Sequence, residues 1–209
     1  VRALLAASVE HGPRRPPVRW LMLSGALLSG VGIYAFYAMQ PYLLELYGDQ
    51  GAYAVAGLAA AVLAATRIAG GLLAPRVRRG LGRRTTVLLG SCGASAILLA
   101  LLGVVDAFVP AVLLLVAWGV SDAAAEPVRR ALLNDLIESP ERATVLSVDS
   151  LVASAGGVVL QPTLGRVADG WGYGASYLVA GAVQMLALPL LVLTRRTSAD
   201  ADTPDTPGR

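Results

Sequence analysis

Six apolar stretches of about 20 residues each limit what this chain can fold into, because a helix of that length crosses the hydrocarbon core of a bilayer. We predict transmembrane helices over residues 20–40, 53–74, 85–105, 108–128, 144–165 and 173–194. We expect Pro41 to end the first and Pro75 the second, because a proline has no backbone N–H to donate. Hydrophobic residues make up 56% of the chain and charged residues 15%, too few charges for a soluble surface. The sequence therefore predicts an all-α integral membrane protein.

Arginines are distributed unevenly among the segments that separate these stretches. Segments 1–19, 75–84, 128–143 and 195–209 hold four, five, three and three of the 17 basic residues, all of them arginines. Arg166 lies in one of the remaining loops, and Arg67 lies within the second stretch. Basic residues near span ends are retained on the cytoplasmic side. We therefore predict a multi-pass protein of the cell (plasma or inner) membrane with both termini in the cytoplasm.

The densest arginine cluster lies in the sequence APRVRRGLGRRTT, residues 74–86. Its members are Arg76, Arg78, Arg79, Arg83 and Arg84. Basic clusters of this kind often bind nucleic acid. Here the cluster lies on the predicted cytoplasmic side, where positive charge fixes the orientation of the helices. We interpret it as a cytoplasmic loop between the second and third helices and expect no nucleic-acid partner.

Three parts of the chain differ in composition. Residues 1–19 are predicted to form a cytoplasmic linker, residues 20–194 the six-helix bundle, and residues 195–209 a disordered cytoplasmic tail of small polar residues and proline. The sequence RRALLNDLI, residues 129–137, alternates apolar and polar residues with helical spacing. We therefore expect the fourth helix to continue beyond the membrane surface. The chain begins with valine, so we expect either an atypical start or a piece of a longer protein.

Residues for common enzyme chemistry are missing from the predicted spans. Cys92 is the only cysteine, so it has no partner for a disulfide and no second thiol for a metal site. His11 is the only histidine, and it precedes the first span. An intramembrane serine protease would need a buried serine with an intramembrane histidine. We expect no enzyme activity, no catalytic residue, no metal site and no cofactor.

The two halves of the bundle show a weak internal similarity. The second helix ends with GLLAPRV, residues 71–77, and the fifth ends with GRVADGWG, residues 165–172. These segments correspond if helices one to three and four to six are copies of one unit in opposite orientations, an arrangement common among transporters. We predict six helices arranged as two inverted three-helix repeats.

The sequence GGLLAPRVRRGLGRRTTVLLG resembles the loop signature of the major facilitator superfamily, approximately Gly-x-Leu-Ala-Asp-Arg-x-Gly-Arg-Arg. The matching loop residues are Gly71, Arg76, Gly82, Arg83 and Arg84. The sequence EPVRRALLNDLIESPERATVLSVDSLVASAGGVVLQPTLGRVADGWG is similar to the tenth-to-eleventh helix region of many superfamily transporters. Pro75 stands where the signature has an acidic residue. We therefore do not assign to this position an ion pair that would switch the conformation of the transporter.

The resemblance covers almost the whole chain and implies helices seven to twelve, the C-terminal half of a twelve-helix carrier. It implies a secondary active transporter, or its C-terminal half, that moves a small organic solute by alternating access with proton coupling. An N-terminal six-helix half, a small-molecule substrate and the lipid bilayer are the implied partners. Drug-like efflux substrates suit the weakly charged cavity better than anionic solutes. The alternatives are a truncated or split half without transport of its own and, third, a six-span membrane enzyme.

Charged residues inside a span raise the free energy of inserting the helix into the bilayer, so each one is expected to have a function or a partner. They are Arg67, Asp122, Glu126 and Asp149, all on helices that the resemblance places around the cavity. Asp122 is the leading candidate for proton coupling, because a carboxylate removed from water holds a proton more readily. The alternative for each acid is a structural ion pair: Asp122 with Arg67, Glu126 with Arg129 or Arg130, and Asp149 with Arg142.

Tyr34 and Tyr37 are three residues apart on one predicted face of the first helix. The pair either contacts the substrate or, as we favour, belongs to an aromatic belt at the outer surface. Glycines such as Gly25, Gly156 and Gly157 are interpreted as sites of close helix packing.

Overall fold

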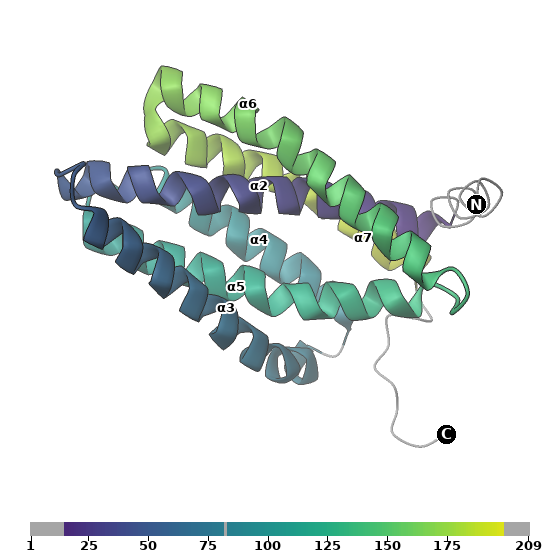
Figure 1. The fold of residues 1–209 in the computed structure, drawn as a ribbon. Coiled ribbons are helices and arrows are strands. Elements are labelled where there is room, and N and C mark those ends of the chain that lie inside the picture. Colours follow the sequence, from purple (N-terminus) through teal and green to yellow (C-terminus); the bar gives the residue numbers. More distant parts are fainter. Residues whose placement is uncertain (1–14, 82, 199–209) are drawn as a thin grey trace.

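The computed structural model describes residues 15–81 and 83–198, which form a bundle of helices without a strand in the described part (Figure 1). The helices are α2 (Pro16–Tyr47), α3 (Tyr53–Leu81), α4 (Arg84–Leu102), α5 (Phe108–Asp135), α6 (Arg142–Met185) and α7 (Ala187–Thr197). We call the bundle end that carries the start of α2 and the end of α7 the arginine-rich end. The starts of α4 and α6 lie at the same end, so the helices run alternately up and down the bundle (Figure 1).

Five stretches of the described helices are long and apolar enough to cross a membrane, which confirms the all-α membrane class. They are Pro16–Tyr47, Tyr53–Leu73, Arg84–Leu102, Phe108–Asp135 and Arg142–Thr197. The last is 56 residues long, far more than one crossing needs. Within it the backbone of Gly172 is not helical, with φ 83° and ψ 167°, and the chain turns back on itself there (Figure 1). This conformation is open essentially to glycine alone.

Two of the expected helix ends are wrong. Pro41 lies inside α2 and Pro75 inside α3. A proline removes one backbone hydrogen bond, but neighbouring helices and local adjustments satisfy the freed groups, so helices of membrane proteins tolerate it. α2 ends instead at Gly48, where φ is 82° and the backbone N–H donates to the carbonyls of Leu44 and Glu45, each at 3.1 Å.

The first and last helices are longer than expected. α2 begins at Pro16, where the missing N–H of proline is not needed, so residues 16–19 belong to a helix and not to the predicted linker. α7 continues to Thr197, three residues beyond the predicted end at 194. Residues 1–14 of the predicted linker, Gly82, and most of the predicted tail lie outside the described residues.

Helix packing is closest where glycines meet. The most extensive contacts join α2 to α6 and α3 to α5, while α4 packs on α5 and α6. A Cβ atom at Gly30 would lie 2.6 Å from the backbone oxygen of Gly156, and a Cβ at Gly70 would lie 2.8 Å from the backbone oxygen of Val120. Small residues let helices approach this closely in a membrane. The interpretation of Gly156 as a packing residue is thereby confirmed.

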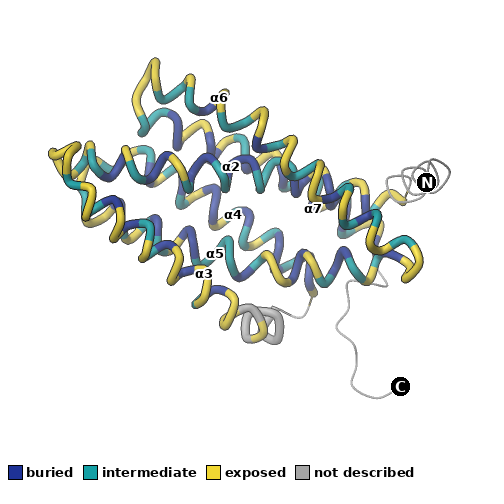
Figure 2. The backbone as a smooth tube through the Cα atoms, in the orientation of Figure 1, coloured by how far each residue is buried: buried dark blue, intermediate teal, exposed yellow. Residues whose placement is uncertain are grey.

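Buried side chains form two clusters, one toward each end of the bundle. The cluster at the arginine-rich end includes Val18, Leu21, Leu132 and Leu191. The cluster at the opposite end contains several tyrosines, and the hydroxyl of Tyr42 there donates to the carbonyls of Leu102 and Val105 at 2.9 and 2.8 Å. α3 is exposed along much of its length (Figure 2).

Candidate functional site

A row of charged side chains follows α5 toward the arginine-rich end. Asp122, Glu126 and Arg130 are spaced four residues apart and therefore share one face of the helix. Arg67 of the adjacent α3 is exposed, with its guanidinium 5.6 Å from the ring centre of Phe36. We call Arg67, Asp122, Glu126 and Arg130 the polar stripe. It lies within stretches apolar enough to cross a membrane or directly beside them, where unpaired charges are costly.

Asp122 is the member of the polar stripe without a direct partner. Its carboxylate is half-buried and makes no hydrogen bond or ion pair with any described residue. The charges of Glu126 and Arg67 act on it from a distance. The alternative pairing of Asp122 with Arg67 is therefore not present in this conformation.

Glu126 has a partner on its own helix. Its carboxylate accepts a hydrogen bond from Nε of Arg130 at 2.5 Å, and both side chains are exposed. Of the two arginines expected for this pairing, the structure selects Arg130, because Arg129 points to the other side of α5 and is buried. A pair four residues apart on a helix surface contributes little to stability.

Asp149 of α6 lies in a buried ion pair. Its carboxylate accepts two hydrogen bonds from Arg129 of α5, at 2.6 and 3.0 Å, and the two residues are 9% and 8% exposed. The same guanidinium lies 3.5 Å from the carbonyl of Leu21 in α2 and fills the space beside Gly25. The expected partner Arg142 instead donates to the carbonyl of Asn134 at 3.3 Å. Spacing along the sequence could not reveal the pairing of Asp149 with Arg129, because it joins two helices.

Tyr34 and Tyr37 are three residues apart in α2 but do not share one environment. Tyr34 is 4% exposed, and its hydroxyl bonds to that of Ser176 in α6. Its ring lies 6.1 Å from that of Tyr177. Tyr37 is 61% exposed and meets the edge of Phe36, with ring centres 5.3 Å apart. Of the two tyrosines, only Tyr37 is open to a solute.

The residues of the loop signature are spread over two helices. Gly71 is exposed in α3 with nothing near it, and Arg76 lies in the same helix. Gly82 lies outside the described residues, and Arg83 is exposed before α4.

Arg84 is the loop-signature residue whose own side chain is buried and in contact with a partner. It is 3% exposed and forms an ion pair with Asp135 at the end of α5. Sequence analysis missed Asp135, although its place at the end of the extended fourth helix, on the side of the arginine loop, was a usable signal. This pair ties the start of α4 to the end of α5.

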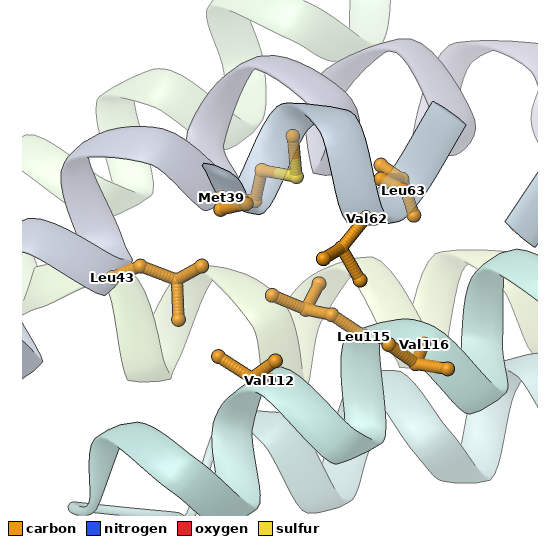
Figure 3. Close-up of a pocket in the computed structure, with 8 residues that line it drawn as sticks. Met39, Leu43, Val62, Leu63, Val112, Leu115 and Val116 are labelled. Atoms are coloured by element: carbon orange, nitrogen blue, oxygen red, sulfur yellow. The ribbon is translucent and has the colours of Figure 1, made fainter. Parts of the chain in front are cut away.

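Sequence analysis also missed Trp118 and an apolar pocket. The indole N–H of Trp118 is buried, has no acceptor among the described residues, and lies one helical turn before Asp122. The pocket is a small hollow between α2, α3 and α5 that is partly open to the surroundings (Figure 3). Its lining residues are Met39, Leu43, Ala59, Val62, Leu63, Val112, Leu115 and Val116. Their apolar side chains are no different in sequence from those that face lipid.

The site has no arrangement that suits a metal ion. Among residues 15–81 and 83–198, no three side chains of histidine, cysteine, aspartate or glutamate gather closely enough to hold one. The chemistry that the site offers is that of one unpaired carboxylate, one exposed guanidinium and an adjacent apolar pocket.

Comparison with known families gives one match. The family model described as Major Facilitator Superfamily matches residues 78–208, which include α4 to α7 and cover more than half of the chain. Comparison with curated proteins gave no match.

Proposed function

The chain belongs to the major facilitator superfamily of membrane transporters, and we propose that it moves a small organic solute by alternating access as the C-terminal half of a twelve-helix carrier. In this proposal the 56-residue stretch crosses the membrane twice, once on each side of Gly172, so the chain has six crossings. Members of the superfamily are transporters rather than enzymes.

The packing of the helices supports an inverted repeat. In the proposed repeat, α2 corresponds to α5, and α3 corresponds to the first arm of α6. The interface of α2 with the first arm of α6 and the interface of α3 with α5 then exchange with each other when the halves are exchanged. The close contacts of Gly30 with Gly156 and of Gly70 with Val120 lie one in each of these two interfaces.

We propose that the arginine-rich end faces the cytoplasm. Positive charge near span ends favours this orientation. Ion pairs brace the same end at or beyond the ends of the apolar stretches: Arg84 with Asp135 and Arg15 with Glu138. The hydrogen bond from Arg15 to Glu138 raises the pKa of the guanidinium, so the charge of Arg15 is retained.

Asp122 is the residue that we assign to proton coupling. A carboxylate at this depth must have a partner or face water, and Asp122 has no partner among the described residues. Asp149 and Glu126 each form an ion pair with an arginine, so Asp122 differs from them in having no such partner among the described residues. The unpaired carboxylate of Asp122 on the polar stripe is the observation that carries this proposal.

The neighbouring surfaces support an apolar solute. The pocket between α2, α3 and α5 is lined by aliphatic side chains and Met39, and Tyr37 exposes an aromatic ring on α2. Such surfaces bind the body of a drug-like molecule, with few polar groups to fix its orientation. Efflux of such solutes is the direction that we propose.

A second six-helix half is the partner that the polar stripe requires. Charged groups of the stripe are exposed on the outside of this bundle, and lipid cannot solvate them. A second half enclosing a water-filled path would place them in water. The alternative, a lone half without transport of its own, leaves the stripe against lipid or forces self-association.

The test is gradient-driven efflux of an apolar fluorescent dye from vesicles of cells that express the native gene. Asp122→Asn should abolish efflux driven by an imposed pH gradient and retain gradient-independent exchange. Asp106→Asn is the matched control, because Asp106 is an exposed carboxylate in the loop before α5. Full gradient-driven efflux by Asp122→Asn would exclude the coupling role.

A further inference from the structure

The described arginines at the arginine-rich end differ in their partners: Arg142 donates to the carbonyl of Asn134, and Arg83 is exposed before α4. Arg15, Arg84, Arg129 and Arg130 are paired with carboxylates. Arg19, Arg195 and Arg196 make no ion pair and no hydrogen bond with any described residue. We call Arg19, Trp20, Arg195 and Arg196 the α2–α7 corner.

The two helices of the corner lie side by side. Val18 and Leu21 of α2 belong to the same buried cluster as Ala187 and Leu191 of α7, and Figure 1 shows the start of α2 beside the end of α7. Arg19 lies in the first turn of α2, and Arg195 and Arg196 lie in the last turn of α7. The corner thus gathers three positive charges that no described carboxylate neutralises.

Arg19 is held by an aromatic ring. Its guanidinium carbon lies 4.5 Å from the ring centre of Trp20, which is half-buried. A guanidinium stacked on a ring keeps its N–H groups available around its edge, in the geometry that a phosphate group accepts. Tryptophan itself is enriched at the level of lipid headgroups. Both features suit a phosphate at this depth.

Exposed apolar side chains lie directly below the arginines. Leu23 is four residues after Arg19 and is 43% exposed, so it lies on the same face of α2 one turn deeper. Val192 is four residues before Arg196 and is 36% exposed, so it lies one turn deeper on α7. The corner therefore presents positive charge at the helix ends and an apolar surface toward the bilayer centre.

From this arrangement we infer that the α2–α7 corner binds an anionic phospholipid. The arginines bind the phosphate of the headgroup, and Leu23 and Val192 contact the acyl chains. A free phosphate ion would use the arginines alone, since it has no apolar part. Basic pockets between membrane helices on the cytoplasmic side suit such headgroups.

The test uses Trp20 as a local reporter of lipid. The double variant Trp118→Phe, Trp171→Phe leaves Trp20 as the only tryptophan. The purified chain is placed in vesicles of phosphatidylcholine and phosphatidylglycerol in which one lipid or the other carries brominated chains, which quench the indole. We expect roughly fivefold or greater preference for phosphatidylglycerol beside Trp20, since one arginine near an anionic surface is worth about this factor. Inorganic phosphate should not displace the lipid.

Charge variants distinguish a specific lipid site at the α2–α7 corner from a general attraction of anionic lipid to the arginine-rich end. Arg19→Gln, Arg196→Gln should remove most of the preference, and Arg83→Gln, Arg142→Gln, which lowers the charge of the same end equally, should retain it. A reporter with Trp171 alone, at the turn beside Gly172, should show no preference. Equal quenching by both lipids at Trp20, equal losses in the two charge variants, or displacement by inorganic phosphate would each overturn the proposal.

Discussion

Arg129 and Asp149 meet inside the bundle through two hydrogen bonds, at 2.6 and 3.0 Å, and so join α5 to α6. The guanidinium also reaches the carbonyl of Leu21, which adds α2 to the junction. Three helices, of which α2 is distant in sequence from α5 and α6, therefore meet at one arginine. The junction also explains why one charged pair lies inside an apolar bundle: each charge satisfies the other.

Breaking this pair should destabilise the protein strongly. Asp149→Asn leaves the buried guanidinium without a counter-charge, at an expected cost of about 3–5 kcal/mol in the free energy of unfolding. Glu126→Gln is the control, because it breaks an exposed pair with Arg130 and should cost less than about 1 kcal/mol. Unfolding in mixed micelles of a mild and a denaturing detergent measures the free-energy cost of each variant. A cost for Asp149→Asn as small as that for Glu126→Gln would contradict the described junction.

A side chain at Gly25 should destabilise the protein by displacing Arg129, and not by changing the helix propensity of α2. In Gly25→Ala the new methyl group would overlap the guanidinium, which must leave its place beside Asp149. We expect a loss of stability of about 1–3 kcal/mol, as for other overpacked sites. Gly32→Ala lies in the same helix with nothing within 4 Å, so it should be neutral or stabilising. Equal effects of the two changes would show that Gly25 acts through helix propensity alone.

The sequence predicts the membrane helices well and their partners poorly. Stretches of about 20 apolar residues mark a crossing whatever surrounds them. The turn at Gly172 is different, because GWGYG contains three glycines and only the fold decides which of them adopts the left-handed conformation. Asp149 could be paired with Arg129 only once α5 and α6 lay side by side. Pro41 was misread, because packing against other helices overrides a local break.

The turn at Gly172 should be intolerant of a side chain. Its φ of 83° with ψ of 167° is strained for any residue with a Cβ atom. Gly172→Ala should therefore cost about 1–3 kcal/mol in the free energy of unfolding. Gly170→Ala, where φ is ordinary and nothing lies within 4 Å, is the matched control and should cost little. Thermal unfolding of both variants in detergent measures this difference. Equal unfolding midpoints for the two variants would mean that the turn lies elsewhere.

The proposed orientation predicts on which side of the membrane each reporter lies. A reporter enzyme fused after Arg196 should be active in the cytoplasm, and one inserted at Asp49, in the turn between α2 and α3, should be active outside. The arginine-rich end and the opposite end are thus tested separately. Reporters that place both sites on the same side of the membrane would contradict the six crossings and the orientation.

Water access to Asp122 tests the proposed transport path most directly. With Cys92→Ala as background, a thiol at residue 122 should react with a charged, membrane-impermeant reagent, because such reagents need a thiolate in water. A thiol in Ile97→Cys, exposed on α4, should remain unreactive if that face contacts lipid. We predict fast labelling of Asp122→Cys in cells that express the native gene, and slow labelling of Ile97→Cys. Equal and negligible labelling of both would mean that Asp122 faces lipid or protein and that no transport path reaches it.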